Sequence, residues 1–310
     1  MFNNSTHKNF WLFENKDQLD DLRRMARENF VEKLMPEDRS KCLTTEDERD
    51  LRQLVEETAQ KFCESFEPPM PPSVAYLGFV YFKRIYLNYS IMEYLAKNVM
   101  MACLYLACKV DEFNVSIDDF VSNLKSGTRE GNTEIILGME VQIMRLLKFH
   151  LTVHGPYRAL EGHFIEMKTK CPEIPKPDVF RKDAAEFLWK SMLTDVNFLY
   201  APSQLALSSI LYASKRLGYD IDSYIENVLC NNDAIQYEKL MTKLNDCNAI
   251  LNQVTPISQE RATEIQEKVR NCVLGLQQRQ LKRRSDQNEN VSYASSGKRT
   301  KYADDDSDLD

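Results

Sequence analysis

Two apolar helical motifs occur twice along this 310-residue chain, at nearly the same interval. Residues 104–109 (LYLACK) align with residues 210–215 (ILYASK) at an offset of 106 residues, and residues 117–121 (IDDFV) align with residues 221–225 (IDSYI) at an offset of 104. Chance similarity between apolar helices is the alternative explanation. Because self-similarity at a fixed interval indicates repeated architecture, the common register favours a duplicated helical unit.

Helical periodicity predicts an all-α protein with two sets of five helices. Only nine glycines and 11 prolines are present, which leaves few residues for the tight turns that strands need. Apolar residues at helical spacing predict helices over approximately 50–66, 73–87, 99–110, 116–124 and 133–149, and then over 157–168, 178–193, 203–217, 221–229 and 233–254.

Further helices flank these two sets. An amphipathic pattern from Leu19 to Leu34 ends at Pro36 and is followed by a charged linker, and a last stripe contains Ile265, Val269, Cys272 and Leu276. The predicted organisation is an N-terminal segment (1–49), a first unit (50–152), a second unit (153–255), a C-terminal helix (256–281) and a charged tail (282–310).

Composition argues against several classes of protein. The net charge of −7 is unlike the basic footprint of a nucleic-acid-binding protein, so direct nucleic-acid binding is not expected. The longest apolar run is about a dozen residues, too short to cross a bilayer, and the first residues lack the apolar core of a signal peptide. Eight scattered cysteines without a CxxC pair suggest buried free thiols rather than disulfides or zinc ligands.

The sequence contains no convincing catalytic motif. The phosphate-binding patterns GxxxxGK[ST] and GxGxxG, the nucleophile pattern GxSxG and the kinase signatures do not occur. His150 and His154 are four residues apart, but Gly155 and Pro156 end any helix there, which favours a junction over a metal site. We therefore expect no cofactor, no metal and no enzymatic activity.

Two charged residues are unusual for their positions. Glu140 falls within an apolar arc of its helix that also contains Ile136 and Ile143, where an unpaired carboxylate is costly to bury. Lys109 ends the most apolar helix of the chain, where it can simply offset the helix dipole. Alternatively, the two charges pair with each other or with a binding partner where their helices meet.

A larger set of motifs gives a specific resemblance. The stretch 106–116 (LACKVDEFNVS), followed by Met139 and Glu140, resembles the signature of cyclins. Further agreement with the cyclins of the CDK-activating kinase comes from residues 2–5 with Trp11, 81–84 (YFKR), 90–94 (SIMEY), 153–158, 193–195 and 202–204. The resemblance implies two tandem cyclin boxes and a regulatory subunit that activates a cyclin-dependent kinase.

The resemblance also implies partners and a site. The implied partners are a cyclin-dependent kinase catalytic subunit, a RING-finger assembly factor and transcription factor IIH, in the nucleus. The implied substrates of the complex are kinase activation loops and the C-terminal repeat of RNA polymerase II. Lys109 and Glu140 match the residues that cyclins present to the kinase, and Glu112 lies in the same motif. Phe113 and Tyr81 are weaker candidates, for which core packing is the alternative.

Some features depart from the family or lie outside its motifs. The predicted first helix, 50–66, lacks the MRAIL-type patch with which cell-cycle cyclins dock substrates. In the tail, Ser307 lies among aspartates and could accept phosphate, with a plain acidic tail as the alternative. A bipartite nuclear-localisation pattern is suggested by Lys282, Arg283, Arg284, Lys298, Arg299 and Lys301.

Two other functions remain as alternatives. A cyclin-fold DNA-binding factor of the general transcription factor IIB type would need a basic face and usually a zinc ribbon. An all-helical enzyme would need a nucleophile, a base or a metal site.

Overall fold

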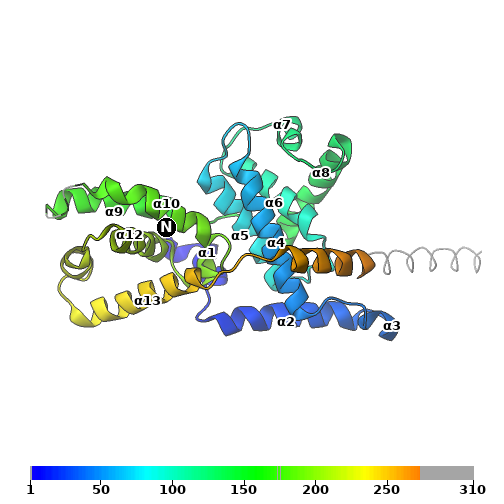
Figure 1. Cartoon of the computed structure of the whole chain (residues 1–310), viewed down its shortest axis with the longest axis horizontal. Coiled ribbons are helices and arrows are strands. Elements are labelled where there is room, and N and C mark those ends of the chain that lie inside the picture. The colour runs from blue at the N-terminus through cyan, green and yellow to red at the C-terminus, as the bar shows by residue number, and fades with distance from the viewer. Residues whose placement is uncertain (1, 173, 175, 273–310) are drawn as a thin grey trace, which may run out of the picture.

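The computed structural model describes residues 2–172, 174 and 176–272, and these residues form an all-helical protein with no strand (Figure 1). The first unit contains α4 (Thr45–Glu64), α5 (Pro72–Asn88), α6 (Ala96–Val110), α7 (Ile117–Ser122) and α8 (Arg129–Leu146). The second contains α9 (Tyr157–Lys170), η2 (Pro177–Phe180), α10 (Arg181–Ser191), α11 (Val196–Leu199), α12 (Pro202–Leu217), η3 (Tyr224–Leu229) and α13 (Ala234–Asn252). The all-α fold with two tandem units is therefore confirmed.

Each unit has its own core around a central helical pair. In the first unit, α5 is buried from Val74 to Leu87 and packs closely on α6. Gly78 permits this approach, because a Cβ atom there would lie 2.6 Å from Leu104 Cδ2. In the second unit, α12 is central and packs against α9, α10 and α13. The first repeated motif lies on α6 and α12, so this duplicated sequence forms the corresponding central helix of each unit. The second lies on α7 and at the start of η3.

Local capping moves several helix boundaries from their predicted places. Helix α4 begins at Thr45 rather than near residue 50, because the Thr44 hydroxyl and the Asp47 carboxylate form a capping box. Helix α8 begins at Arg129, capped by Thr128, four residues before the predicted start at residue 133. Pro36 follows α2, as predicted, but it also begins the short α3 (Pro36–Arg39) inside the predicted linker.

One predicted α-helix has a different form. The segment predicted over 221–229 winds as the π-helix η3, and it is followed by Asn231 and Asn232 in the left-handed region (φ 50° and 62°). Asparagine tolerates this region better than most residues, so the wide turn ends without glycine. Helical spacing does not distinguish a short π-helix from an α-helix.

The N-terminal residues connect the two units. They contain η1 (Phe2–Asn4), α1 (Thr6–Trp11) and α2 (Lys16–Glu32). Trp11 Nε1 donates to His150 Nδ1 of the first unit at 3.2 Å, and the Phe13 amide donates to the Phe198 carbonyl of the second at 2.8 Å. The His154 amide donates to His7 Nδ1 at 3.0 Å. We call residues 2–13 the N-terminal clasp.

Acidification is expected to loosen the N-terminal clasp through His7. Burial, with Arg84 and His154 nearby, lowers the pKa of His7 from 6.5 to about 3. The folded protein therefore keeps His7 neutral while the unfolded chain binds a proton. The contribution of neutral His7 to the free energy of unfolding is complete above pH 6.5. It is lost as the pH falls below that value, by about 2 kcal/mol at pH 5. The fluorescence of Trp11 in a Trp189→Phe background measures the change.

The matched control for this titration is His7→Asn, which keeps a hydrogen-bond acceptor that does not titrate. It is expected to flatten the part of the pH profile between 6.5 and 5. The same profile in both proteins would show that His7 does not control the clasp.

A cluster of largely buried charges joins α2 to both units. Arg23 of α2 donates two hydrogen bonds of 2.7 Å to the two carboxylate oxygens of Asp195, between α10 and α11. Lys83 of α5 donates to Glu56 of α4 at 2.8 Å and lies 3.9 Å from Asp195. We call these four residues and the buried Arg52 the junction cluster. It ties α2, the first unit and the second unit together.

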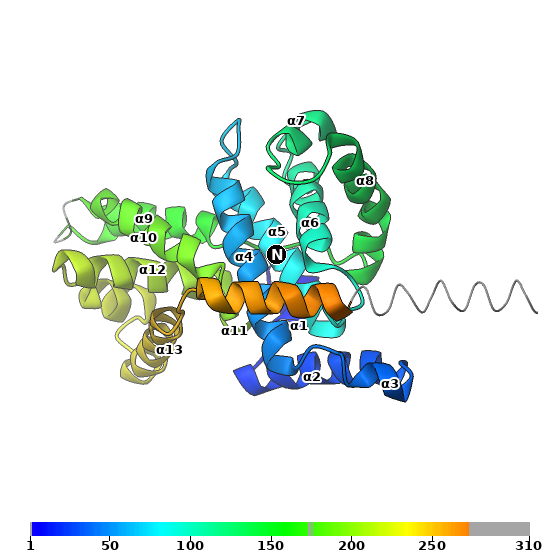
Figure 2. The ribbon, with the colours of Figure 1, turned by 45° about the vertical axis from the view of Figure 1, so that its right-hand side comes forward.

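A C-terminal helix packs across α4. It spans residues 259–272 in the described part of the chain and crosses α4 in Figure 2. Arg261 and Lys268 donate to Asp47 at 3.0 and 2.9 Å, and Ile265 is fully buried. The predicted helix and its stripe are therefore confirmed as far as Cys272, while Leu276 lies outside the described residues. None of the described helices combines the length and apolarity needed to cross a bilayer.

Candidate functional site

Lys109 and Glu140 form an ion pair at the first unit's surface. Lys109, near the end of α6, donates its ammonium to both oxygens of Glu140 on α8, at 2.7 and 2.8 Å. The Lys109 side chain is 45% exposed and that of Glu140 is 20% exposed. The ammonium also lies 4.8 Å from the centre of the Tyr105 ring. The two unusual charges thus pair with each other, and the pair remains accessible from outside.

The second unit has no charged counterpart of this pair. Lys215 on α12 corresponds to Lys109 in the repeat, and it donates to the amide oxygen of Asn245 on α13 at 2.9 Å. The two units therefore share a lysine that bonds across helices, but a carboxylate accepts this bond only in the first. The corresponding surfaces of the two units therefore differ in charge.

Exposed apolar side chains flank the ion pair in sequence. Leu137 and Val141 are 44% and 51% exposed and lie within one turn of Glu140 on α8. Val110, next to Lys109, is 39% exposed, and Phe149 just beyond α8 is 64% exposed. We call these four residues with Lys109 and Glu140 the α6–α8 patch. Exposed apolar groups around a charged pair are typical of a protein-binding surface.

Sequence reasoning missed the apolar members of this patch. The sequence of α8 has more apolar residues than the core buries. These additional apolar residues were the signal that could have indicated an exposed apolar surface. Phe149 carries a second signal, because its φ of 58° places an exposed aromatic residue in the left-handed region. That conformation follows from the chain turn after α8, where the Phe149 amide donates to the Met144 carbonyl at 2.9 Å.

Glu112 and Phe113 end α6 in a Schellman turn. The Phe113 amide donates to the Cys108 carbonyl at 2.9 Å, and the Glu112 amide donates to the Lys109 carbonyl at 3.4 Å. Glu112 has a φ of 57° and is exposed, while Phe113 is half-buried, with its ring 6.3 Å from that of Phe66. Glu112 therefore lies near the ion pair, and Phe113 packs mainly against the core.

Replacing Glu112 with glycine is expected to stabilise the isolated protein by about 0.5–1 kcal/mol. Glycine adopts the left-handed region without the steric cost that a side chain carries there. Urea unfolding measures the gain, and Glu112→Ala is the matched control because it removes the carboxylate without relieving the strain. A loss of stability in Glu112→Gly would mean that the carboxylate makes a contact essential to the fold.

Tyr81 lies within the core of the first unit. Its side chain is fully buried, and its hydroxyl donates to the Leu151 carbonyl at 2.6 Å. Burial raises the pKa of this phenol. This placement supports the core-packing alternative, so we leave Tyr81 out of the contact surface proposed below.

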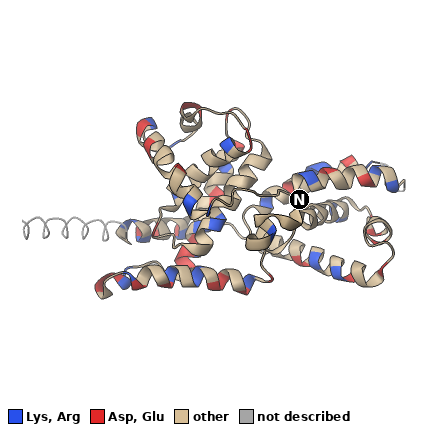
Figure 3. Cartoon of the chain, turned by 180° about the vertical axis from the view of Figure 1, so that it is seen from behind, with Lys and Arg blue, Asp and Glu red and all other residues tan. Residues whose placement is uncertain are grey.

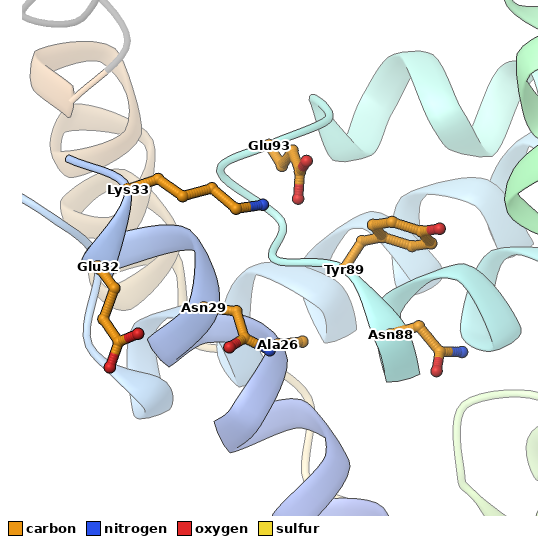
Figure 4. Close-up of a pocket in the computed structure, with 7 residues that line it drawn as sticks. All are labelled: Ala26, Asn29, Glu32, Lys33, Asn88, Tyr89 and Glu93. Carbon is orange, nitrogen blue, oxygen red and sulfur yellow. The ribbon is translucent and has the colours of Figure 1, made fainter.

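A polar hollow lies elsewhere, between α2 and the end of α5. Its volume is about 430 Å³, and Lys33 extends across it toward Glu93, beside Asn29 and Tyr89 (Figure 4). Its lining carries charges of both signs and no cluster of metal-binding residues. No group of three or more histidine, cysteine, aspartate or glutamate residues that could hold a metal ion occurs in the part of the chain that the structure describes.

The charge distribution does not favour the DNA-binding alternative. In the view of Figure 3, lysine and arginine alternate with aspartate and glutamate along the helices instead of gathering on one basic face. The basic tail residues Lys282, Arg283, Arg284, Lys298, Arg299 and Lys301, and Ser307, lie outside the described residues.

Comparison with known proteins places this fold. The profile of the cyclin N-terminal domain matches residues 25–152, and that of the cyclin C-terminal domain matches residues 155–252. Cyclin-H of Xenopus laevis is 35% identical over 280 residues, covering 88% of this chain and 87% of the relative.

Solved structures agree with the fold. A chain of the CAK complex of Chaetomium thermophilum, bound to ATP-gamma-S, superposes with a TM-score of 0.72 and 20% identity, covering 99% of this chain and 98% of that chain. A chain of the yeast TFIIK (Kin28/Ccl1/Tfb3) complex superposes with a TM-score of 0.59 and 22% identity, covering 80% and 99%. The chain belongs to the cyclin family, within its cyclin H group.

Proposed function

We propose that this chain is the regulatory subunit that activates the CDK-activating kinase, in association with transcription factor IIH. Support comes from its place in the cyclin H group and from neighbours solved as CAK and TFIIK complexes. The complex would phosphorylate CDK activation loops and the C-terminal repeat of RNA polymerase II. The chain itself contributes no catalytic group.

The observation that carries the proposal is the α6–α8 patch. A kinase becomes active when its C-helix moves inward, so that the glutamate of that helix pairs with the ATP-binding lysine. A rigid partner can stabilise this position by offering apolar contacts and fixed charges to the helix. The Lys109–Glu140 pair, with the exposed Leu137, Val141 and Phe149 close to it in sequence, provides such a surface.

We also propose a division of roles between the two units. Every residue of the α6–α8 patch lies within the first cyclin box, which we propose spans 50–152, and Glu112 follows Lys109 by three residues. The second box, 153–255, supports the first through the junction cluster and offers surface for further subunits. The yeast neighbour was solved as a three-chain complex, which supports a RING-finger assembly factor as an additional partner of this chain. We place the assembly in the nucleus.

Reconstitution of kinase activity tests the proposal. The purified chain is added to an isolated CDK-activating kinase catalytic subunit, with a polymerase-tail peptide as substrate. We expect a gain of at least about ten-fold over the catalytic subunit alone, with or without the RING-finger factor. The control is the same chain added to a kinase that does not depend on a cyclin.

The same assay can also reject the proposed activating role. No gain in the three-subunit mixture, with all proteins folded and no co-purification of chain and kinase, would reject the activating role. Binding of the isolated chain to DNA in the same preparation would then favour the transcription factor alternative.

A further inference from the structure

An apolar groove lies on the first unit, apart from the α6–α8 patch. It has a volume of about 690 Å³ and lies between α4, the N-terminal half of α6, the segment 123–126 and the helix 259–272. In Figure 2 the helix 259–272 crosses α4 and the nearby end of α6. Its apolar lining includes Leu51, Leu54, Phe62, Met101 and Leu124. A hollow of this kind holds apolar side chains of a peptide or helix.

The charged residues at the edge of the groove are all basic. Lys61, Lys97 and Lys125 line it and are exposed, and none of the residues that line the groove is acidic. In a chain of net charge −7, this is a local reversal of the overall charge. The groove therefore suits a segment that combines apolar side chains with carboxylates.

The chain itself carries such a segment within reach. The helix 259–272 forms one wall of the groove through Val269 and Cys272, and 38 residues follow it. The last nine residues, 302–310 (YADDDSDLD), hold five aspartates, one tyrosine and one leucine. The 30 residues from Cys272 to Tyr302 can span up to about 100 Å, so the segment reaches the groove easily.

We propose that the acidic C-terminal segment 302–310 docks in this groove, with Tyr302 and Leu309 as apolar anchors and its aspartates facing Lys61, Lys97 and Lys125. Because the segment is tethered to the wall of the groove, weak contacts suffice to occupy it. Occupation by the chain's own end would exclude peptides of other proteins from this surface. The proposal concerns the isolated chain and does not depend on kinase activation.

Zero-length carbodiimide cross-linking of the full-length chain tests the docking. The reagent joins a lysine amine to a carboxylate in direct contact, and mass spectrometry of the monomer band identifies the pair. Apart from local cross-links to Lys298 and Lys301, which docking does not affect, we expect Lys61, Lys97 and Lys125 to form most cross-links to Asp304–Asp310. Lys239 and Lys243 on α13 are the reference lysines. The cross-links should be lost in 1 M salt, where the screening length is about 3 Å.

Tail variants separate docking from simple charge attraction. Tyr302→Ser with Leu309→Ser keeps every carboxylate and lysine and cannot disturb the core described here. It should lower the cross-link yield about ten-fold through the loss of apolar burial. Val291→Ser is the matched control and should leave the yield unchanged.

Three results would overturn the proposal. One is a spread of tail cross-links over all surface lysines, including Lys239 and Lys243, or none to the groove lysines. Another is an unchanged yield in the Tyr302→Ser, Leu309→Ser variant. The third is the same cross-links confined to covalent dimers, which would assign the groove to a second copy of the chain.

Discussion

Reversal of Lys109 to glutamate is expected to lower kinase activation about 100-fold while the protein stays folded. The substitution places two carboxylates where one ion pair stood, in the middle of the α6–α8 patch. When a charge pair is covered by a partner, the loss of one member costs several kcal/mol of binding, because the other charge is desolvated without compensation. Titration of the kinase with the variant measures both the affinity and the maximal activity.

The fold should tolerate this reversal. The Lys109 side chain is 45% exposed in the free protein, and solvent-screened pairs contribute only about 0–1 kcal/mol to stability. Urea unfolding and circular dichroism are therefore expected to show small changes. A large loss of stability would mean that the pair is mainly structural.

Two variants control for the meaning of the result. Lys109→Glu combined with Glu140→Lys restores the pair within the chain but inverts what the partner meets, so activation should remain low. Lys215→Glu changes the corresponding lysine of the second unit, which bonds to Asn245, and should retain nearly full activation. Full recovery in the double variant, or equal losses in Lys109→Glu and Lys215→Glu, would remove the ion pair from the proposed contact surface.

The sequence allowed much of this architecture to be predicted because its signals are local and periodic. Apolar residues at helical spacing predicted the central helices α5, α6 and α12, whose burial follows from composition alone. The repeat interval predicted the two units. Lys109 and Glu140 stood out because each charge interrupts an apolar pattern, and this is why the pair was accessible to sequence reasoning.

What remained hidden depends on contacts between distant residues. Arg23 and Asp195 are separated by 172 residues, and neither interrupts a pattern in its own segment. The start of α4 depended on a side-chain capping box, which outweighed the apolar periodicity used to place it. Exposure of Leu137 and Val141 follows from how α8 sits on α6, which helical spacing alone does not determine.

Asp195→Asn is expected to destabilise the protein by about 3 kcal/mol, since it removes one partner of a largely buried ion pair whose Asp195 side chain is 20% exposed. Arg23 is 9% exposed and makes both of its 2.7 Å bonds to this carboxylate, and Lys83 lies 3.9 Å away. The variant leaves Arg23, Lys83 and the buried Arg52 with Glu56 as the remaining carboxylate of the cluster. Denaturant unfolding measures the loss, and hydrogen exchange in α2 reports whether that helix separates first.

The same substitution should change the acid sensitivity of the protein. Burial alone would raise the pKa of Asp195, but Arg23 and Lys83 hold it well below its usual 3.8. Its contribution to stability is therefore complete above that value and is lost as the pH falls below it. Wild-type protein should lose stability below pH 4 more steeply than Asp195→Asn, measured by urea midpoints at successive pH values. Burial raises the pKa of Glu56 and gives an opposite slope in both proteins, which is smaller in Asp195→Asn because the Asp195 carboxylate adds to this rise.

An exposed carboxylate serves as the control for the loss of stability expected in Asp195→Asn. Glu186 bonds to Lys190 and Arg216 on the surface of the second unit and is 37% exposed, so Glu186→Gln should cost less than about 1 kcal/mol. Arg23→Met should cost less in the Asp195→Asn background than in the wild type, by at least about 1 kcal/mol, because the two residues act as one pair. If Asp195→Asn cost no more than Glu186→Gln, and if the two cluster variants were additive, the junction cluster would not be what holds α2 against both units. The N-terminal clasp and the apolar contacts of Leu19 would then have to provide that attachment.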